Sequence, residues 1–228
     1  MNFELMKESL PRLVQGIPET LILVSISLAI GFVLAIVAAQ MRLARQPFLS
    51  WPARAYIYVF RSTPLLVQIF LIYYGSGQFR HFLQDAGLWF FFREAWCCAI
   101  SALALNTGAY TAEIIRGGIQ SVSHGEIEAG RAVGMSPYTL FRRIIFPVAI
   151  RQALPSYGNE VILMVKSSSL ASTITILEIT GIAKKIIAAT YAPVEVFIIA
   201  GSIYLGINFL ITRIISHTER RLSPQLFR

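Results

Sequence analysis

A small set of polar side chains lies in stretches of sequence that are otherwise apolar. They are Asn106, Thr107, Tyr110 and Glu113 in one stretch, and Asn159 and Glu160 in another. Ionisable groups in an apolar environment are costly, so they usually face a cavity or the interior of a helix bundle. Such carboxylates, amides and hydroxyls can hold a polar or cationic solute. They can equally tie one helix to another, and the sequence leaves both roles open.

The sequence shows no arrangement suited to covalent chemistry. It contains no nucleophile paired with a base and no cluster with metal-ligand spacing. A phosphate-binding Gly-x4-Gly-Lys-Ser/Thr sequence is also absent. We therefore expect the chain to be neither an enzyme nor the binder of a cofactor.

The composition is typical of a protein embedded in a membrane. Of the 228 residues, 55% are hydrophobic and 14% are charged, and the mean hydropathy is +0.62. Soluble domains carry about a quarter charged residues, and disordered chains combine high charge with low hydrophobicity. The two cysteines, Cys97 and Cys98, are adjacent, which argues against a disulfide-rich secreted domain. The remaining class is an all-α integral membrane protein.

Five segments are apolar enough to cross a bilayer as helices of about 20 residues. They cover residues 20–41, 55–74, 95–115, 152–169 and 196–212. The second contains Arg61 and Pro64, which we interpret as a break in the helix rather than a ligand site.

Two of the apolar stretches carry interruptions. The fourth span contains Pro155 and Lys166 besides Glu160, and we still predict a spanning helix there. Residues 170–190 are interrupted by Gly181 and two lysines. For them we predict a short helix at the membrane surface or a partly re-entrant hairpin.

The net charge of +8 has two interpretations, a nucleic-acid footprint or basic residues sorted to one side of a bilayer. Twelve of the twenty lysines and arginines fall in the loops after the first and third spans and in the tail, which includes Arg228. Six fall on the other side, and two lie within spans. The positive-inside rule therefore predicts an external N-terminus and a cytoplasmic C-terminus, with no nucleic-acid partner.

The predicted cytoplasmic loop, at about residues 121–148, carries clear signals for two short helices. Ser123 and Glu126 have the spacing of a capping box. Gly134 falls where a left-handed residue would end that first helix.

The second helix of this loop has its own boundaries. Ser136 and Pro137 suit an N-cap and a first helical position. Pro147 is expected to stop the helix. The loop would then project from the membrane as a helix, a turn and a second helix.

The same loop resembles the EAA loop of ABC importer permeases. The family pattern is Glu-Ala-Ala, three residues, Gly, nine residues, then Ile-x-Leu-Pro. The matching residues are Glu128, Ala129, Gly130, Gly134, Ile144, Phe146 and Pro147. Gly130 replaces the second alanine and Phe146 replaces leucine. An amphipathic helix pair lying on lipid is the alternative, but it does not explain why Gly134 and Pro147 match the motif.

Other stretches resemble the permeases for polar amino acids. Residues 60–68, FRSTPLLVQ, are similar to the family's F-R-G-T-P-L-L-V-Q, with Ser62 in place of glycine. Residues 104–117 and 157–167 are similar as well. Within the family, the likeness is greatest to the histidine/lysine/arginine and opine branch.

The resemblance implies a fold and a set of partners. The fold would be that of a type I ABC importer permease (MetI-like), one transmembrane domain over residues 1–228 with about five spans. The partners would be two ATPase subunits that bind ATP and Mg, a second permease (a copy or a paralogue), an extracytoplasmic solute-binding protein and membrane lipid. The location would be the bacterial inner membrane.

The resemblance also implies roles for the residues. The coupling element to the ATPase would include Glu126 with the matched residues of the EAA pattern. A polar amino acid, expected to be a basic amino acid or an opine, would be held by the polar groups named at the outset, with Glu113 or Glu160 as the carboxylate for a cationic side chain. A self-contained secondary transporter or channel is the alternative, which the small size and the lack of repeated halves disfavour.

Overall fold

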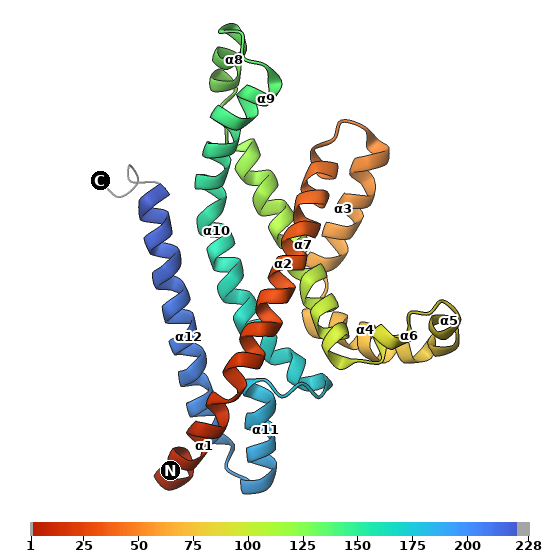
Figure 1. Ribbon diagram of the computed structural model, residues 1–228, viewed down its shortest axis with the longest axis vertical. Helices are drawn as coiled ribbons and strands as arrows, with labels where there is room; N and C mark the ends of the chain where they lie inside the picture. Colours follow the sequence, from red (N-terminus) through yellow and green to blue (C-terminus); the bar gives the residue numbers. More distant parts are fainter. Residues whose placement is uncertain (1, 223–228) are drawn as a thin grey trace.

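The computed structural model describes residues 2–222, which are helical almost throughout and contain no strand (Figure 1). The helices are α1 (Phe3–Val14), α2 (Gly16–Leu43), α3 (Pro47–Ser62), α4 (Leu65–Gln78), α5 (Arg80–Asp85), α6 (Trp89–Phe92), α7 (Ala95–Gln120), α8 (His124–Ala132), α9 (Pro137–Leu140), α10 (Phe146–Ser167), α11 (Ile179–Thr190) and α12 (Pro193–Leu222). A π-helical segment, Phe141–Ile145, precedes α10, and a 3₁₀ segment, Ser168–Ile174, follows it.

The number of spans agrees with the sequence. Three helical stretches of the described chain are long and apolar enough to cross a membrane, and they correspond to α1–α2, α7 and α12. Two bent pairs, α3 with α4 and α10 with α11, pass the same test together. Counting each pair as one span makes five.

The predicted second span is not one straight helix. It breaks between α3 and α4, whose axes differ by 105°. Pro64 has no N–H to continue the helix, and Thr63, the residue before it, is extended with φ −112° and ψ 145°. The expected break at Arg61 and Pro64 is therefore confirmed, and it divides the span into two helices.

The crossing of α2 and α7 depends on glycine. A Cβ on Gly31 of α2 would lie 3.0 Å from the carbonyl oxygen of Ala104 and would overlap the side chain of Thr107. A Cβ on Gly108 of α7 would lie 2.7 Å from the hydroxyl of Tyr56. Small residues allow helix backbones in a membrane to approach this closely. The crossing fixes the position of Thr107 within the bundle.

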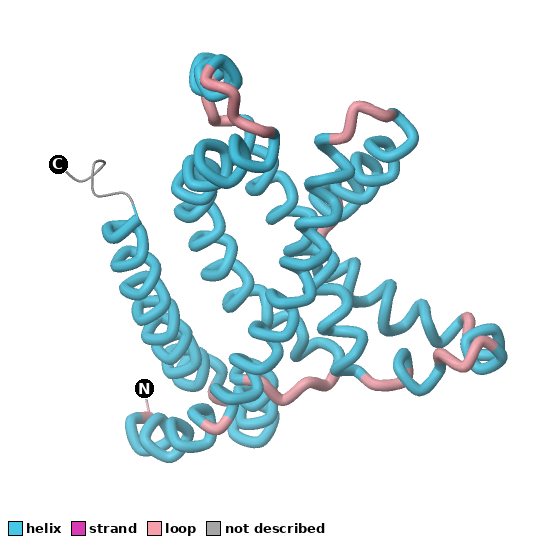
Figure 2. The backbone as a smooth tube through the Cα atoms, turned by 45° about the horizontal axis from the view of Figure 1, so that its top comes forward, coloured by secondary structure: helices cyan, strands magenta, loops and turns pink. Residues whose placement is uncertain are grey.

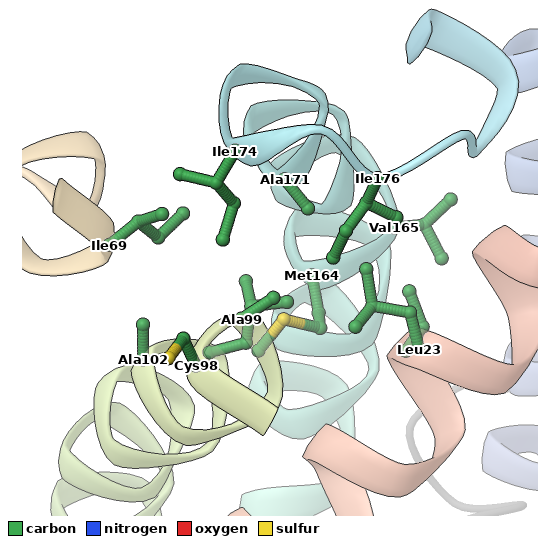
Figure 3. Close-up of a cluster of buried hydrophobic side chains, with 12 residues drawn as sticks. Leu23, Ile69, Cys98, Ala99, Ala102, Met164, Val165, Ala171, Ile174 and Ile176 are labelled. Carbon is green, nitrogen blue, oxygen red and sulfur yellow. The ribbon is translucent and has the colours of Figure 1, made fainter. Parts of the chain in front are cut away.

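A shared core joins helices that are distant in sequence. Its buried members include Leu23 of α2, Ile69 of α4, Ala99 of α7, Met164 of α10 and Ile174 of the 3₁₀ segment. Figure 3 shows these side chains converging from separate helices. The two bent pairs are thereby held against α2 and α7.

Residues 170–190 do not form a hairpin. After the 3₁₀ segment they form the single helix α11, bent 48° from the preceding helix. Ile186 of α11 is fully buried in a second core with Leu13 of α1 and Val196 of α12, while Lys184 and Lys185 are exposed. The lysines therefore interrupt only the exposed face of α11, which together with α10 forms a broken span or a re-entrant segment.

The basic loops gather at one end of the molecule. The α2–α3 turn, the α8–α9 hairpin and the end of α12 all lie toward the top of Figure 1, and the start of α1 lies at the bottom. Figure 2 shows the same separation from a second direction. The described chain therefore starts and ends at opposite ends of the bundle, as an odd number of spans requires. Arg228 lies outside the described residues.

Candidate functional sites

The hairpin of α8 and α9 begins and turns as its sequence predicts. The hydroxyl of Ser123 accepts a hydrogen bond from the backbone N–H of Glu126 at 3.2 Å, which caps α8. Gly134 has φ +78°. Its N–H donates to the carbonyl of Arg131, and the N–H of Met135 donates to the carbonyl of Gly130. These two bonds define a Schellman motif, which needs a left-handed residue at position 134.

The second half of the hairpin starts as expected but does not end at Pro147. Ser136 caps α9 by accepting from the N–H of Thr139 at 3.3 Å. The chain then passes through the π-helical segment directly into α10, where Pro147 lies in the first turn. The N–H of Phe146 donates to the carbonyl of Phe141, five residues back.

The prediction that Pro147 stops the helix is therefore wrong. A proline is tolerated at the first turn of a helix, where its missing N–H would have no intrahelical partner. The wider π-helical turn just before it changes the hydrogen-bond register at that point. The hairpin is consequently continuous with the spanning helix α10.

A buried glycine joins the two arms of the hairpin. A Cβ on Gly130 would lie 2.5 Å from Cδ1 of Leu140 and 3.0 Å from Cδ1 of Ile144. Gly130 and Leu140 are both buried. Two residues of the EAA pattern, Gly130 and Ile144, therefore lie next to each other in the structure. Leu140 completes the contact, although the motif gives no signal for it.

The outer surface of the hairpin combines charge with exposed apolar side chains. Glu126, Glu128 and Ala129 are exposed, and they lie on α8. Val133 is 73% exposed and Tyr138 is 71% exposed, on either side of the turn. Large apolar groups displayed together beyond the ends of spanning helices are typical of a protein interaction site.

Two of the predicted intramembrane residues form a buried pair. The hydroxyl of Thr107 on α7 donates to Oε1 of Glu160 on α10 at 2.8 Å. Thr107 is 1% exposed and Glu160 is 7% exposed. Within the described part of the chain, Thr107 is the hydrogen-bond donor to Glu160, and Oε2 is not among the fully buried polar atoms that lack a partner. Lys166, a possible partner for Glu160 along the same helix, is exposed.

Asn106 belongs to a different network, at the α3–α4 break. Its amide donates to Oε1 of Gln68 at 3.0 Å and to the carbonyl of Phe60 at 3.2 Å. Gln68 in turn donates to the carbonyls of Phe60 and Thr63 and to the hydroxyl of Thr63. Gln68, the last residue of the FRSTPLLVQ motif, was not predicted as a site residue. It satisfies carbonyl groups that the helix break leaves without partners.

Tyr110 lies beside the same break. The guanidinium of Arg61 sits 5.1 Å from the centre of the Tyr110 ring, a cation–π contact. The Tyr110 hydroxyl is 3.4 Å from the carbonyl oxygen of Arg61. Arg61 is exposed, so a cationic group is presented near the polar face of α7.

The remaining predicted residues are separate from this cluster. Glu113 is bound by the guanidinium of Arg116 at 2.6 Å and lies 3.6 Å from that of Arg42 on α2. Asn159 is exposed. The structure therefore does not bring all six predicted residues into one site.

A further buried carboxylate was missed by the sequence analysis. Glu178 is fully buried; it accepts from the N–H of Gly181 at 2.8 Å and from the hydroxyl of Tyr204 on α12 at 2.5 Å. The Tyr204 hydroxyl is also 3.1 Å from that of Thr180. Glu178 caps α11 and ties it to α12. Its position directly before a new helix is the signal that indicates this role.

The sequence matches the model of one protein family over most of its length. The matched family is described as the binding-protein-dependent transport system inner membrane component, and the match covers residues 31–224. The chain belongs to this family of ABC transporter permeases. The permease is thus a membrane subunit, and its relatives are permease proteins rather than enzymes.

Three named relatives show which members of the family the permease resembles. It is 62% identical to the nopaline transport system permease protein NocM of Agrobacterium fabrum, over 99% of this chain and 94% of the relative. It is 58% identical to the octopine transport system permease protein OccM of Rhizobium meliloti, over 96% and 89%. It is 43% identical to the histidine/lysine/arginine/ornithine permease HisM of Escherichia coli, over 90% and 87%.

Solved structures agree with this fold. A crystal structure of an amino acid ABC transporter with histidines has a chain that is 37% identical, with a TM-score of 0.85 over 97% of this chain and 99% of that one. A chain of the MetNI methionine ABC transporter is 19% identical, with a TM-score of 0.75 over 94% and 98%. The MetI-like fold predicted from the sequence is confirmed.

Proposed function

We propose that the permease carries a basic amino acid or an opine across the bacterial inner membrane, driven by ATP hydrolysis on partner subunits. The observation that carries this proposal is the identity of 43–62% to permeases for opines and for basic amino acids, over nearly the full chain. The working transporter would contain two ATPase subunits that bind ATP and Mg, a second permease and an extracytoplasmic solute-binding protein.

The α8–α9 hairpin is the proposed contact with the ATPase. Its exposed apolar residues, Val133 and Tyr138, flank the turn at Gly134 and suit insertion into a groove on a partner. Glu126 and Glu128 add charge on the exposed face of α8. The remaining motif residues, Ala129, Gly130, Ile144 and Pro147, support the hairpin or its exit into α10.

The Thr107–Glu160 pair is the proposed contact with the cationic part of the solute. The carboxylate is buried, and Thr107 occupies Oε1 alone. A guanidinium or ammonium group at Oε2 would supply a donor and the opposite charge. Glu113 is already paired with Arg116 on its own helix and with Arg42 on α2, so we assign it to holding α2 against α7.

The break at Pro64 supplies the second part of this proposal. Asn106 and Tyr110 follow one face of α7, beside Arg61. Arg61 lies at the helix break as expected, but in this proposal it is also a ligand residue, because its cationic group suits the carboxylate that amino acids and opines share. Asn159 is exposed, directly before Glu160 in the sequence, and we keep it as a candidate solute contact.

Reconstitution tests the proposal as a whole. The permease is placed in vesicles with its ATPase, its second permease and its binding protein, and uptake of labelled arginine is measured with and without ATP. Unlabelled nopaline, octopine, histidine and a neutral amino acid then compete. We expect ATP-dependent uptake that basic amino acids or opines inhibit. ATP-independent uptake would contradict the driving mechanism, and inhibition by neutral amino acids alone would contradict the substrate class.

Orientation is tested separately. The proposed arrangement has the N-terminus outside and the C-terminus in the cytoplasm. A single cysteine introduced at exposed Val133 should react with an impermeant thiol reagent only in inside-out vesicles, in a Cys97→Ala/Cys98→Ala background. Labelling of that cysteine in intact cells would reverse the orientation.

A further inference from the structure

The segment between α4 and α7 carries several exposed aromatic side chains. It contains α5 and α6, and Figure 1 shows it extending sideways from the bundle, across the direction of α12. Phe79 is 66% exposed, Phe82 is 69% exposed and Phe90 is 67% exposed. Large apolar groups displayed together on one short segment indicate contact with another protein or with a membrane.

The aromatic residues of α6 divide between the bundle and the surroundings. Phe92 packs against the shared core. The ring of Phe91 lies edge-on to that of Phe92, with 5.2 Å between the ring centres. Phe90, directly before them, is exposed. The segment is therefore fixed to the bundle through Phe92, while Phe90 is presented to whatever surrounds the molecule.

The short helix α5 has one apolar and one polar side. Successive residues of an α-helix are about 100° apart, so Phe82 and Leu83 fall on the same side as Phe79, the N-cap residue. Leu83 is buried against the protein, which leaves the two phenylalanines as the exposed apolar surface. The opposite side is polar and exposed, and it consists of Arg80, His81, Gln84 and Asp85. Such a helix is suited to lie in the plane of a membrane surface.

The neighbouring residues indicate the depth of this segment in the membrane. Only Arg93 and Glu94 separate α6 from the spanning helix α7, and they form an exposed ion pair at 3.1 Å. An exposed charged pair directly before an apolar span lies at the membrane boundary. The guanidinium of Arg80 lies 5.3 Å from the centre of the Trp89 ring. Tryptophan and arginine side chains with one apolar and one polar part favour the same boundary.

We propose that the α5–α6 segment anchors the permease in the phospholipid interface, with Phe79, Phe82 and Phe90 inserted among the acyl chains. This interface is at the opposite end of α7 from the α8–α9 hairpin, and with the N-terminus outside it belongs to the outer leaflet. The lipid contact itself does not depend on that orientation. The polar side of α5 would face the headgroups and water.

The arrangement of charge favours lipid over a protein partner. A second permease or a binding protein that covered the phenylalanines would also meet the charged groups on the other side of this six-residue helix. The centres of protein interfaces are depleted of charged residues. A membrane surface instead accommodates both sides at once, because its apolar and aqueous regions are only a few ångströms apart.

Spin-label accessibility in the assembled transporter tests the proposal. Phe82→Cys and Phe90→Cys are made singly in a Cys97→Ala/Cys98→Ala background, labelled with a nitroxide and reconstituted in phospholipid nanodiscs without the binding protein. Collisions are measured with oxygen, which concentrates in lipid, and with a water-soluble nickel chelate. Gln84→Cys, on the polar side of α5, is the matched control. The ratio of oxygen to nickel collisions should be roughly threefold or more higher at positions 82 and 90 than at position 84.

A second measurement leaves the labelled position outside the phenylalanines. Ala86→Cys carries the nitroxide, since residue 86 is exposed and lies on the same side of α5 as Phe79. Phe82→Ser/Phe90→Ser should lower the oxygen-to-nickel ratio there to about that of the Gln84→Cys control. Phe82→Leu/Phe90→Leu keeps apolar side chains and should leave the ratio as it is in the parent protein.

Three outcomes would overturn the proposal. A nickel-dominated signal at positions 82 and 90 would show that the phenylalanines face water, as a surface for the binding protein would. Low collision with both reagents would show that another subunit covers them. An equal change at position 86 in the serine and leucine variants would locate the effect in the packing of the segment rather than in its contact with lipid.

Discussion

The α8–α9 hairpin and the Thr107–Glu160 pair are built in opposite ways. The hairpin is closed by bonds between near neighbours, such as Ser123 with Glu126 and Met135 with Gly130. The buried pair joins residues 53 positions apart and exists only because α7 packs against α10. A local element keeps its shape wherever the bundle moves. A pair between two helices responds to any change in their packing, which is a useful property for a solute contact.

The largest expected effect is on the hairpin. Gly134→Asp places a carboxylate at the exposed turn, where docking would bury it without a partner. Coupled uptake in reconstituted vesicles should fall roughly a hundredfold, since an uncompensated buried charge costs about 3 kcal/mol or more. Membrane insertion should be unchanged.

Gly134→Asn is the matched control for that variant. Asparagine tolerates the left-handed conformation and carries no charge, so uptake should stay close to that of the wild type. Normal coupled uptake by Gly134→Asp would remove the docking assignment. Equal failure of both variants would locate the defect in the backbone turn.

The buried pair should give the next largest effect. Glu160→Gln keeps an oxygen that accepts from Thr107 but removes the charge. Uptake of a cationic solute should fall roughly tenfold, because hydrogen bonds to charged groups contribute about 1.5–3 kcal/mol. The thermal midpoint of the purified chain should change little. Glu113→Gln is the contrast, because it breaks the ion pairs with Arg116 and Arg42. This variant should lower the thermal midpoint and leave the uptake close to that of the wild type.

A smaller effect is expected at the α3–α4 break. Gln68→Ala removes the donor to Phe60 and Thr63 and the acceptor for Asn106. Leaving these groups without partners should lower the free energy of unfolding by about 2 kcal/mol. Asn106→Ala and the double variant complete a cycle, measured by thermal unfolding in detergent. Additive effects in that cycle would show that the two amides do not act together.

The smallest effect is expected at the start of α8. Ser123→Ala removes one N-cap and should destabilise that helix by about 1 kcal/mol. Hydrogen exchange should then be faster at the amide of Glu126 and its neighbours, with no change at the Thr107–Glu160 pair. Ser121→Ala serves as the control, because its hydroxyl bonds to the carbonyl of Gly118 on α7 instead. A change in exchange across α10 would contradict the local character of the hairpin.

The contrast between local contacts and contacts across helices explains which features the sequence could predict. Ser123 and Gly134 act on residues within a few positions, so their roles follow from spacing alone. The break at Pro64 is equally local. The five apolar stretches likewise follow from composition, because the bilayer sets their length.

The failures all involve partners that local sequence does not name. The effect of Pro147 depends on the hydrogen-bond register that the preceding π-helical turn establishes. Gln68 and Glu178 are recognisable only once the groups that they satisfy are known, and Tyr204 lies 26 residues from Glu178. The six predicted intramembrane residues separated for the same reason, since helix packing decides which of them meet.

The π-helical segment ahead of α10 has a mechanical consequence. The chain runs from the hairpin into α10 without a break in helical structure, so the two form a lever, with Pro155 inside its α10 part. From Ile144 to Glu160 the lever is about 24 Å long at the rise of an α-helix. A rotation of the hairpin would therefore move the Glu160 carboxylate relative to α7.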